Sequence, residues 1–177
     1  MTNQILINLL DTEGNRIGSI EKLEAHKLGV LHEAFSIFIF NDEGKLLLQK
    51  RNKEKYHSGG LWTNTCCGHA NYEEEINVAT HRRLQEEMGF DTELKKIFNF
   101  TYKVELENQL FENETDHVFF GKSESTPIPD PEEVEDFKWI AIQDLIDDAN
   151  ANPDAYTEWL KIILKDQSFL DEISKLK

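Results

Sequence analysis

The sequence predicts an α+β fold, and three observations support this class. Short runs rich in aromatic and β-branched side chains, such as residues 34–40 (AFSIFIF), are typical of strands. Longer segments without glycine or proline, such as residues 73–88, carry apolar side chains at helical spacing. The two kinds of segment follow one another without regular strand–helix–strand alternation, which favours α+β packing over a doubly wound sheet.

Turn signals set the order of the predicted elements along the chain. Residues 41–44 (NDEG) form a turn between two apolar runs, which predicts a hairpin. Gly89 stands where the C-terminal cap of the longest helix belongs. The predicted strands are residues 4–10, 34–40, 45–51, 61–65, 97–106, 117–121 and 137–142, the predicted helices are residues 73–88, 143–149, 153–165 and 169–175, and the main loops are residues 11–15, 52–60 and 127–131.

Length and composition limit the classes of protein to consider. The 177 residues suit one compact domain, which we expect to span residues 1–177. The net charge of −15 argues against a nucleic-acid-binding protein. The sequence shows no apolar stretch long enough to span a bilayer, and its N-terminus predicts a strand and not a signal peptide. The two cysteines, Cys66 and Cys67, are adjacent and poorly placed to form a disulfide, which indicates free thiols in a cytosolic protein.

Residues 68–90 (GHANYEEEINVATHRRLQEEMGF) combine a loop with a helix that ends in paired carboxylates. Glu87 lies eleven residues after Ile76 and therefore returns to the same, core-facing side of the helix. A carboxylate there is costly unless it is paired or binds a metal. Arg83, one turn earlier, offers an ion pair, so pairing and metal binding are both open for Glu87.

A second group of polar residues surrounds Cys67. A cysteine two residues before His69 is by itself an ordinary buried thiol beside an ordinary histidine. Other imidazoles and carboxylates recur, however, and alternate carboxylates on a strand point to one face. The segment from residue 26 to 32 (HKLGVLH) is predicted to be a flexible loop. The residues concerned, His26, His32, His69, Glu112 and Glu114, suit manganese, zinc or another transition metal better than calcium.

The helix motif resembles the Nudix box, in which a glycine, a glutamate, an arginine and a pair of glutamates recur at fixed spacing. Residues 68–90 match it with one departure, Arg83, which stands where Nudix hydrolases carry a metal-binding glutamate. The resemblance implies the Nudix fold, an α+β arrangement with a mixed β-sheet sandwiched between α-helices. Replacing a metal-binding carboxylate by a cation weakens the expectation of pyrophosphate hydrolysis.

Further motifs resemble those of the type I isopentenyl diphosphate isomerases. WTNTCCGH, at residues 62–69, looks like their cysteine motif, and FENETDHVFFG, at residues 111–121, looks like their glutamate motif. LHEAFSIFIFN resembles the segment after their metal-binding histidines, and EKLEAH resembles the stretch that carries a substrate-binding lysine. Together the similarity extends over nearly the whole chain.

The resemblance implies that the protein shifts the double bond of isopentenyl diphosphate to give dimethylallyl diphosphate in isoprene biosynthesis. This needs an acid and a base on either side of the substrate, an aromatic ring facing the cation, and exclusion of water. By resemblance, the catalytic residues are Cys67, Glu114 and Tyr102, the substrate-binding residues are Lys22, Arg51, Lys55, Arg83 and Trp159, and the metal ligands are His26, His32, His69, Glu87, Glu112 and Glu114.

Each assignment has a plainer alternative. Trp159 could be an ordinary core residue, and the basic run at residues 50–55 could be solvated surface charge and not a diphosphate-binding patch. Gly59 and Gly60 could form a turn or give a lid its mobility. The family's pattern gives no role to His57, His81 or His117, and Cys66 is expected to be structural.

The resemblance also implies the cofactors and partners. Mg²⁺ would bridge Glu87 to the diphosphate, and a second divalent ion, Mn²⁺ or Zn²⁺, would occupy the histidine and glutamate group. We expect a cytoplasmic monomer or homodimer that acts on a small molecule and engages neither nucleic acid nor membrane. Two rival hypotheses are a Nudix hydrolase of nucleoside diphosphate derivatives and a Nudix-fold binding module without activity.

Overall fold

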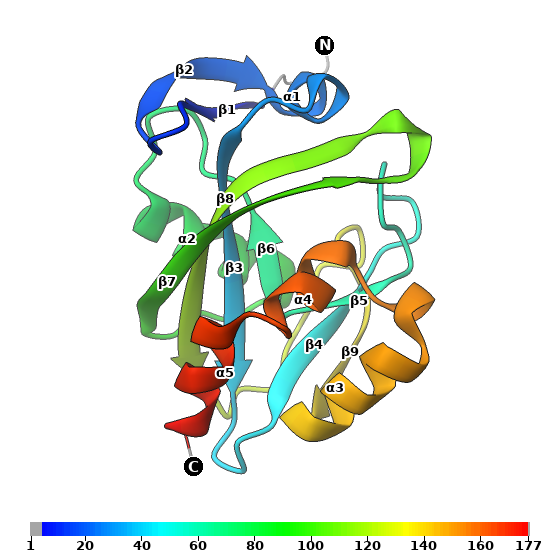
Figure 1. The fold of residues 1–177 in the computed structure, drawn as a ribbon. Helices are drawn as coiled ribbons and strands as arrows, with labels where there is room; N and C mark the ends of the chain where they lie inside the picture. Colours follow the sequence, from blue (N-terminus) through cyan, green and yellow to red (C-terminus); the bar gives the residue numbers. More distant parts are fainter. Residues whose placement is uncertain (1–4, 177) are drawn as a thin grey trace.

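The computed structural model describes residues 5–176, in which nine strands form one mixed sheet with helices on both faces (Figure 1). The central strand, β3, runs antiparallel to β1, β4 and β6 and parallel to β8. The predicted α+β class and the mixed sheet between helices are therefore confirmed. The strands are β1 (Leu6–Leu10), β2 (Arg16–Glu21), β3 (His32–Phe40), β4 (Leu46–Arg51), β5 (Trp62–Thr63), β6 (Cys66–Gly68), β7 (Leu94–Glu105), β8 (Phe111–Lys122) and β9 (Val134–Ile140), and the helices are α1 (Lys22–Leu28), α2 (Ile76–Met88), α3 (Ile142–Ala151), α4 (Glu158–Ile163) and α5 (Gln167–Ser174).

The sheet opens between β3 and β4. In the described chain these strands pair at Phe40 and Leu46, beside their connecting turn, and then separate as Figure 1 shows. β6 pairs with β3 on one side of the opening, and β5 pairs with β4 on the other. Between them, the Thr65 hydroxyl donates to the carbonyl of Leu47 at 2.6 Å and accepts from the backbone N–H of Ile39 at 2.9 Å. One side chain thus joins the two separating strands.

Each face of the sheet carries its own hydrophobic core, because alternate side chains of a strand point to opposite faces. The face under α3, α4 and α5 buries Phe38, whose ring centroid lies 5.0 Å from that of Phe169. The opposite face buries Phe35 and Ile37 in one core with Leu84 of α2. The two layers account for the large fraction of aromatic residues in this sequence, since each buried aromatic side chain contributes about 1.5–3 kcal/mol.

Helix α2 follows the predicted stripe of apolar residues. Ala79, Thr80, Leu84 and Met88 are fully buried. The helix begins at Ile76 and not at residue 73, because the preceding turn leads the chain through positive φ before the first helical residue. It ends at a glycine in the left-handed conformation, as predicted.

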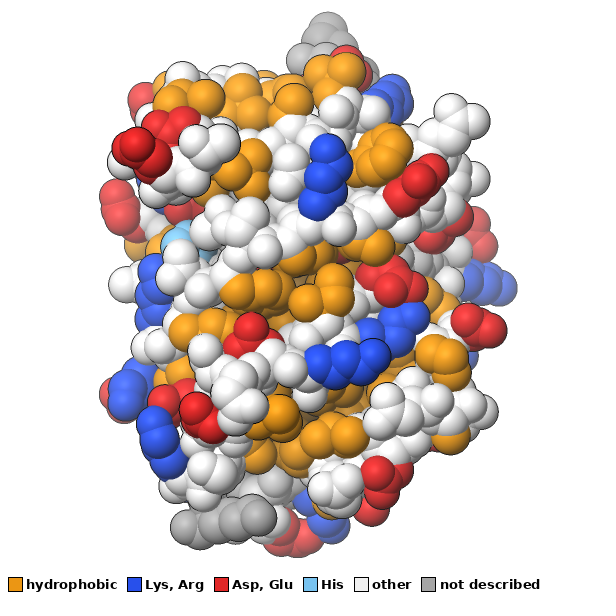
Figure 2. Space-filling model, in the orientation of Figure 1, with side chains coloured by type: hydrophobic (Ala, Val, Ile, Leu, Met, Phe, Trp, Pro, Cys, Tyr) orange, Lys and Arg blue, Asp and Glu red, His pale blue; other side chains and the backbone are white. Residues whose placement is uncertain are grey.

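The N-terminal part differs most from the prediction. The first strand is confirmed from Leu6 to Leu10, while residue 4 lies outside the described residues. The strand β2 and the helix α1 were not predicted, and the loop expected between His26 and His32 is confined to residues 29–31, because α1 continues to Leu28. Gly29 is the left-handed cap of α1, and its backbone N–H donates to the carbonyl of Ala25. Figure 2 shows hydrophobic side chains gathered over the hairpin of β1 and β2. The exposed apolar residues of this hairpin include Leu6 and Ile17.

Two further elements differ in length. The strand predicted at residues 117–121 is the end of β8, which begins at Phe111 and pairs along its length with β3 and β7. The helix predicted at residues 153–165 is a short 3₁₀ turn, Pro153–Ala155, followed by α4, because Tyr156 and Thr157 are extended. Among residues 5–176, none of the helices combines the length and the apolar composition that crossing a bilayer requires.

Candidate active site

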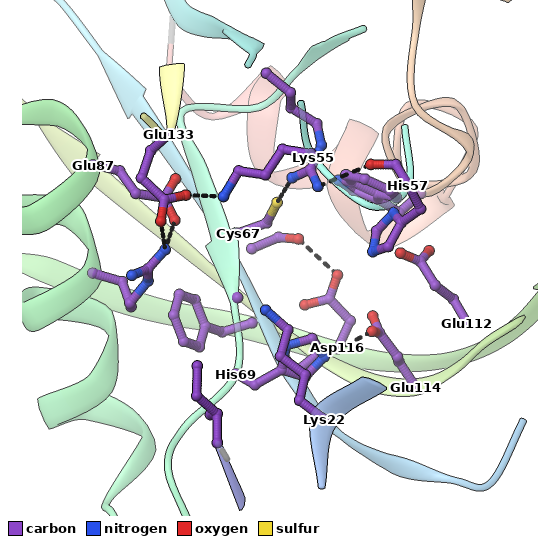
Figure 3. Close-up of a pocket in the computed structure, with 18 of the residues that line it drawn as sticks. Lys22, Lys55, His57, Cys67, His69, Glu87, Glu112, Glu114, Asp116 and Glu133 are labelled. Atoms are coloured by element: carbon purple, nitrogen blue, oxygen red, sulfur yellow. Dashed lines mark hydrogen bonds and ion pairs between the residues drawn. The ribbon is translucent and has the colours of Figure 1, made fainter. Parts of the chain in front are cut away.

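A pocket lies at the opening between β3 and β4 and collects most of the residues that the sequence singled out (Figure 3). Cys67 comes from β6, on one side of β3, and Glu114 comes from β8, on the other. Both pair with residues of β3 whose side chains face the same layer. The pocket is also lined by Lys22, Arg51, Lys55, His57, His69, Arg83, Glu87, Tyr102, Glu112, Asp116, Glu133 and Trp159.

Three imidazoles converge on one carboxylate oxygen. Oε1 of Glu114 lies 3.0 Å from Nε2 of His69, 3.2 Å from Nε2 of His32 and 3.9 Å from Nε2 of His26. Donors bound to one ion at about 2.1 Å stand roughly 3–3.5 Å apart, so the separations of His69 and His32 fit a divalent metal, and that of His26 is slightly longer. The four ligand atoms all lie within 4.8 Å of one another.

The tautomers of His26 and His32 also support metal binding. Nδ1 of His26 donates to the carbonyl of Lys22 at 2.7 Å, and Nδ1 of His32 donates to the carbonyl of Val30 at 2.9 Å. Such bonds fix the ring and leave the Nε2 lone pair free, as in many metal ligands. Both Nε2 atoms are buried without a hydrogen-bond partner. Burial also lowers the pKa of His26 and lowers that of His69 to about 3, which favours neutral imidazoles. Lone pairs facing a carboxylate oxygen repel it unless a cation lies between them.

A second carboxylate lies beside the first. Glu112 and Glu114 alternate on β8 and are both buried, as predicted. The hydroxyl of Tyr102, on the adjacent strand β7, lies 2.9 Å from Glu112 and 2.8 Å from Glu114. Burial and the charge of Glu114 raise the pKa of Glu112, whereas the nearby imidazoles of His32 and His69 outweigh the burial of Glu114 and lower its pKa. The pKa values of the two neighbouring carboxyl groups are thus shifted in opposite directions.

The two cysteines face opposite layers of the sheet. Cys66 is completely buried in the core beneath α2, in keeping with the structural role expected for it. Cys67 faces the pocket, and both thiols are unpaired. Burial raises the pKa of Cys67 to about 12, although the nearby guanidinium of Arg51 opposes the shift. The Cys67 side chain is thus a protonated thiol in the surroundings described.

The four basic residues expected at the diphosphate all line the pocket, but they do not come from one surface patch. Lys55 pairs with Glu133, and Arg83 lies 3.4 Å from the same carboxylate. Of the basic run at residues 50–55, Arg51 and Lys55 line the pocket, whereas the other two basic residues do not. Lys50 reaches outward toward Glu135, and Lys53 is exposed, because successive side chains of a strand and its loop diverge.

Glu87 is buried on the core-facing side of α2, as its position in the sequence predicts. One of its oxygens accepts from Arg83, which is the ion pair considered as its plainer role. The other oxygen accepts from the side-chain amide of Gln49 at 2.8 Å. Metal binding by Glu87 would add to these contacts and stays a prediction.

Trp159 combines its two expected roles. The side chain is 3% exposed and belongs to the core beneath α4, yet one face lines the pocket. The guanidinium of Arg51 lies 5.3 Å from the centre of its ring, and the indole N–H donates to Asn64. A desolvated ring face of this kind attracts a cation by about 2 kcal/mol.

Sequence reasoning missed Asp116, Glu133 and His57 as pocket residues. Asp116 lies two residues after Glu114 on the same face of β8, a period that could have revealed it. Ser36 donates to it at 2.7 Å, and burial followed by the charge of Glu114 raises the pKa of Asp116 to about 8. Burial and then Arg51 lower the pKa of His57 to about 2.

Gly59 and Gly60 form a tight turn, which was one of their two expected roles. Gly60 has a φ of +75°, and a Cβ on Gly59 would lie 2.5 Å from the backbone oxygen of Lys53.

The histidines without an expected role also have contacts. His81 pairs with Asp91 at 2.6 Å, and His117 lies 3.4 Å from Glu33.

The comparisons with known proteins agree with this geometry. The NUDIX domain family matches residues 30–160. The isopentenyl-diphosphate Delta-isomerase 2 of Photorhabdus laumondii is 50% identical, over 96% of this chain and 95% of its own. This chain belongs to the isopentenyl-diphosphate Delta-isomerase family. The enzyme of that name from Serratia proteamaculans is 47% identical, over 91% of this chain and 90% of its own.

Solved structures extend the likeness of this isomerase-family chain at the level of the fold. The crystal structure of DR0079 from Deinococcus radiodurans has a TM-score of 0.76 at 16% identity and covers 90% of this chain and 97% of its own. A MutT NUDIX hydrolase from Burkholderia pseudomallei has a TM-score of 0.60 at 22% identity and covers 76% and 96%. The Nudix fold is thereby established for this member of the isomerase family.

Proposed function

We propose that this chain isomerises isopentenyl diphosphate to dimethylallyl diphosphate. The observation that carries the proposal is that Cys67 and Glu114 enter one pocket from opposite sides of β3. The hydroxyl of Tyr102 is hydrogen-bonded to Glu114. A 1,3-shift of a double bond needs one group to donate a proton to the terminal carbon and another to remove a proton across the allylic unit. A thiol and a carboxylate on two sides of a substrate satisfy this requirement.

The surroundings suit such a reaction. The positive charge that a diphosphate needs would come from Lys22, Arg51, Lys55 and Arg83. The bound substrate would replace the ion pairs of Lys55 with Glu133 and of Arg83 with Glu87. Trp159 presents a ring face to the pocket, where it would stabilise positive charge developing on the hydrocarbon part. Glu114 is buried and Cys67 is half-buried, so a substrate that fills the pocket would displace water from around the reacting carbons.

Divalent metals belong to the same proposal. His26, His32, His69, Glu112 and Glu114 would hold a manganese or zinc ion, which supplies positive charge beside the carboxylates. Glu87 would hold a Mg²⁺ ion that bridges to the diphosphate. We further propose that residues 1–177 act as a single domain, as a monomer or homodimer in the cytoplasm, without nucleic-acid or membrane partners.

Incubation with isopentenyl diphosphate and divalent metal in deuterated water tests the reaction. We expect dimethylallyl diphosphate that carries deuterium, and we expect Cys67→Ala to abolish its formation. Cys66→Ala is the matched control, because it removes the neighbouring thiol from the other face of the sheet. Release of phosphate or pyrophosphate from nucleotides, without isomerisation, would instead identify a Nudix hydrolase. A folded, metal-loaded protein with neither activity would be a binding module.

A further inference from the structure

One hydrogen bond joins two walls of the pocket that come from different parts of the chain. The first wall is the loop between β4 and β5 (residues 52–61), and the second is the hairpin of β7 and β8. The loop passes beside the tip of the hairpin (Figure 1), where the backbone N–H of Ser58 donates to the side-chain carboxylate of Glu107. Within the described residues 5–176, this is the one hydrogen bond between the loop and the hairpin.

The loop carries residues that the proposed reaction needs. Lys55, Tyr56 and His57 line the pocket, and Lys55 is one of the four basic residues proposed to bind the diphosphate. Ser58 follows directly, is buried and has a φ of +50°, a backbone conformation that residues with a side chain rarely adopt. Such a conformation persists only where surrounding contacts hold it, so the hydrogen bond to the hairpin helps to set the course of the preceding residues.

The hairpin carries residues of the proposed acid–base chemistry. Tyr102 on β7 and Glu114 on β8 are partners in its register. The tip of the hairpin is a 3₁₀ turn, Glu107–Gln109, which a backbone hydrogen bond of 2.7 Å from Leu106 to Leu110 closes. The carboxylate that accepts from the loop is therefore attached to the wall that holds Tyr102 and Glu114.

We propose that Glu107 is a positioning residue, which holds the diphosphate-binding loop in place relative to the acid–base residues on the hairpin. Glu107 is exposed and does not line the pocket, so it acts on the substrate through the loop and its Lys55. The proposal rests on the function proposed above. Its sign differs from that of charge alone, because loss of a carboxylate near an anionic substrate favours binding, whereas loss of a positioning contact weakens binding.

Steady-state kinetics and hydrogen exchange of Glu107→Ala test the proposal. We expect KM for isopentenyl diphosphate to rise roughly tenfold and kcat to change less than about twofold, because the variant frees the loop but leaves Cys67 and Glu114 in place. The amides of residues 52–61 should exchange faster with deuterated water, while those of β8 should not. Glu107→Gln keeps an oxygen that accepts from the Ser58 N–H and loses the charge, so it should restore most of the substrate affinity and of the protection.

Glu105→Ala is the matched control, because Glu105 is an exposed carboxylate on the same hairpin, two residues before Glu107. It should leave KM and the exchange of the loop unchanged. If Glu107→Ala behaves like this control or lowers KM, or if Glu107→Gln raises KM as much as Glu107→Ala does, the role of Glu107 is refuted while the reaction stands. If the unmodified protein does not isomerise its substrate, the reaction proposed above fails instead. Exchange of the loop, together with calorimetry of inorganic pyrophosphate binding, then decides the role of Glu107 without turnover.

Discussion

The ion pair between Glu74 and Arg82 yields a prediction for stability. These two residues occupy signature positions of the Nudix box; Arg82 lines the pocket, whereas Glu74 does not. The guanidinium of Arg82 donates to both carboxylate oxygens of Glu74, at 2.8 and 2.7 Å. The backbone N–H of Asn71 donates to the same carboxylate at 2.8 Å. We therefore expect Glu74→Gln to destabilise the fold.

The magnitude follows from the exposure of the pair. Hydrogen bonds to charged groups contribute about 1.5–3 kcal/mol when buried, and exposed ion pairs contribute about 0–1 kcal/mol. The side chains of Glu74 and Arg82 are 15% and 30% exposed, which places this pair between the two cases. We expect a loss of about 1–2 kcal/mol in the free energy of unfolding, or roughly 2–8 °C in Tm for a chain of this size.

Urea unfolding of a double-mutant cycle measures this coupling. The cycle combines Glu74→Gln with Arg82→Met, and it cancels the second contact that Arg82 makes with Glu86 at 3.3 Å. The hydrogen bond from Arg82 lowers the pKa of Glu74 below its ordinary value of 4.5. The stability that Glu74 contributes is therefore complete above about pH 5 and is lost as pH falls through its folded-state pKa. A coupling energy below about 0.3 kcal/mol, or one that does not change with pH, would refute the reasoning.

Three further predictions concern the site and the fold. Tyr102→Phe should lower kcat roughly 10–150-fold, the equivalent of one hydrogen bond to a charged group, and change KM for isopentenyl diphosphate little; an unchanged kcat would contradict a role for the hydroxyl. Gly89→Ala should lower the free energy of unfolding by well over about 1 kcal/mol, because the residue has a φ of +75° and the new Cβ would lie 2.2 Å from the oxygen of Ile128; Gly14→Ala, with a similar φ and open space, should cost less in the same urea assay. Chelation should abolish isomerisation, and Mg²⁺ alone should restore part of it; complete recovery with Mg²⁺ alone would argue against a transition-metal site.

The sequence predicted those helices and strands whose pattern of apolar residues matches the faces that the fold buries. The apolar run of β3 and the amphipathic pattern of α2 are of this kind, and their burial decides their structure. The first half of β8 was not recognised, because it carries Glu112, Asn113 and Glu114, which strands usually avoid. These side chains are tolerated there because they belong to the pocket. The strand β2 has no fully buried residue and a central glycine, so it lacks the alternation that would have revealed it.

Most of the candidate site was predicted through family motifs, and local physics alone would have reached less of it. The alternation of Glu112 and Glu114 and the inward position of Glu87 follow from the periods of strand and helix. Other residues of the pocket do not follow from these periods, because they come from segments distant in sequence. Glu133 lies 46 positions after Glu87, and His57 reaches the pocket through a loop whose course depends on tertiary contacts.

The hydroxyl of Thr65 has a consequence for the position of the reactive thiol. Because it bonds to Ile39 on one strand and Leu47 on the other, it is held by both sides of the opening at once. Cys67 follows two residues later, on the short strand that begins just after this contact. A shift of β3 relative to β4 must therefore pull on the segment that carries the thiol. The position of Cys67 therefore depends on both β3 and β4. A change in the distance between these strands would also change the direction in which the thiol points.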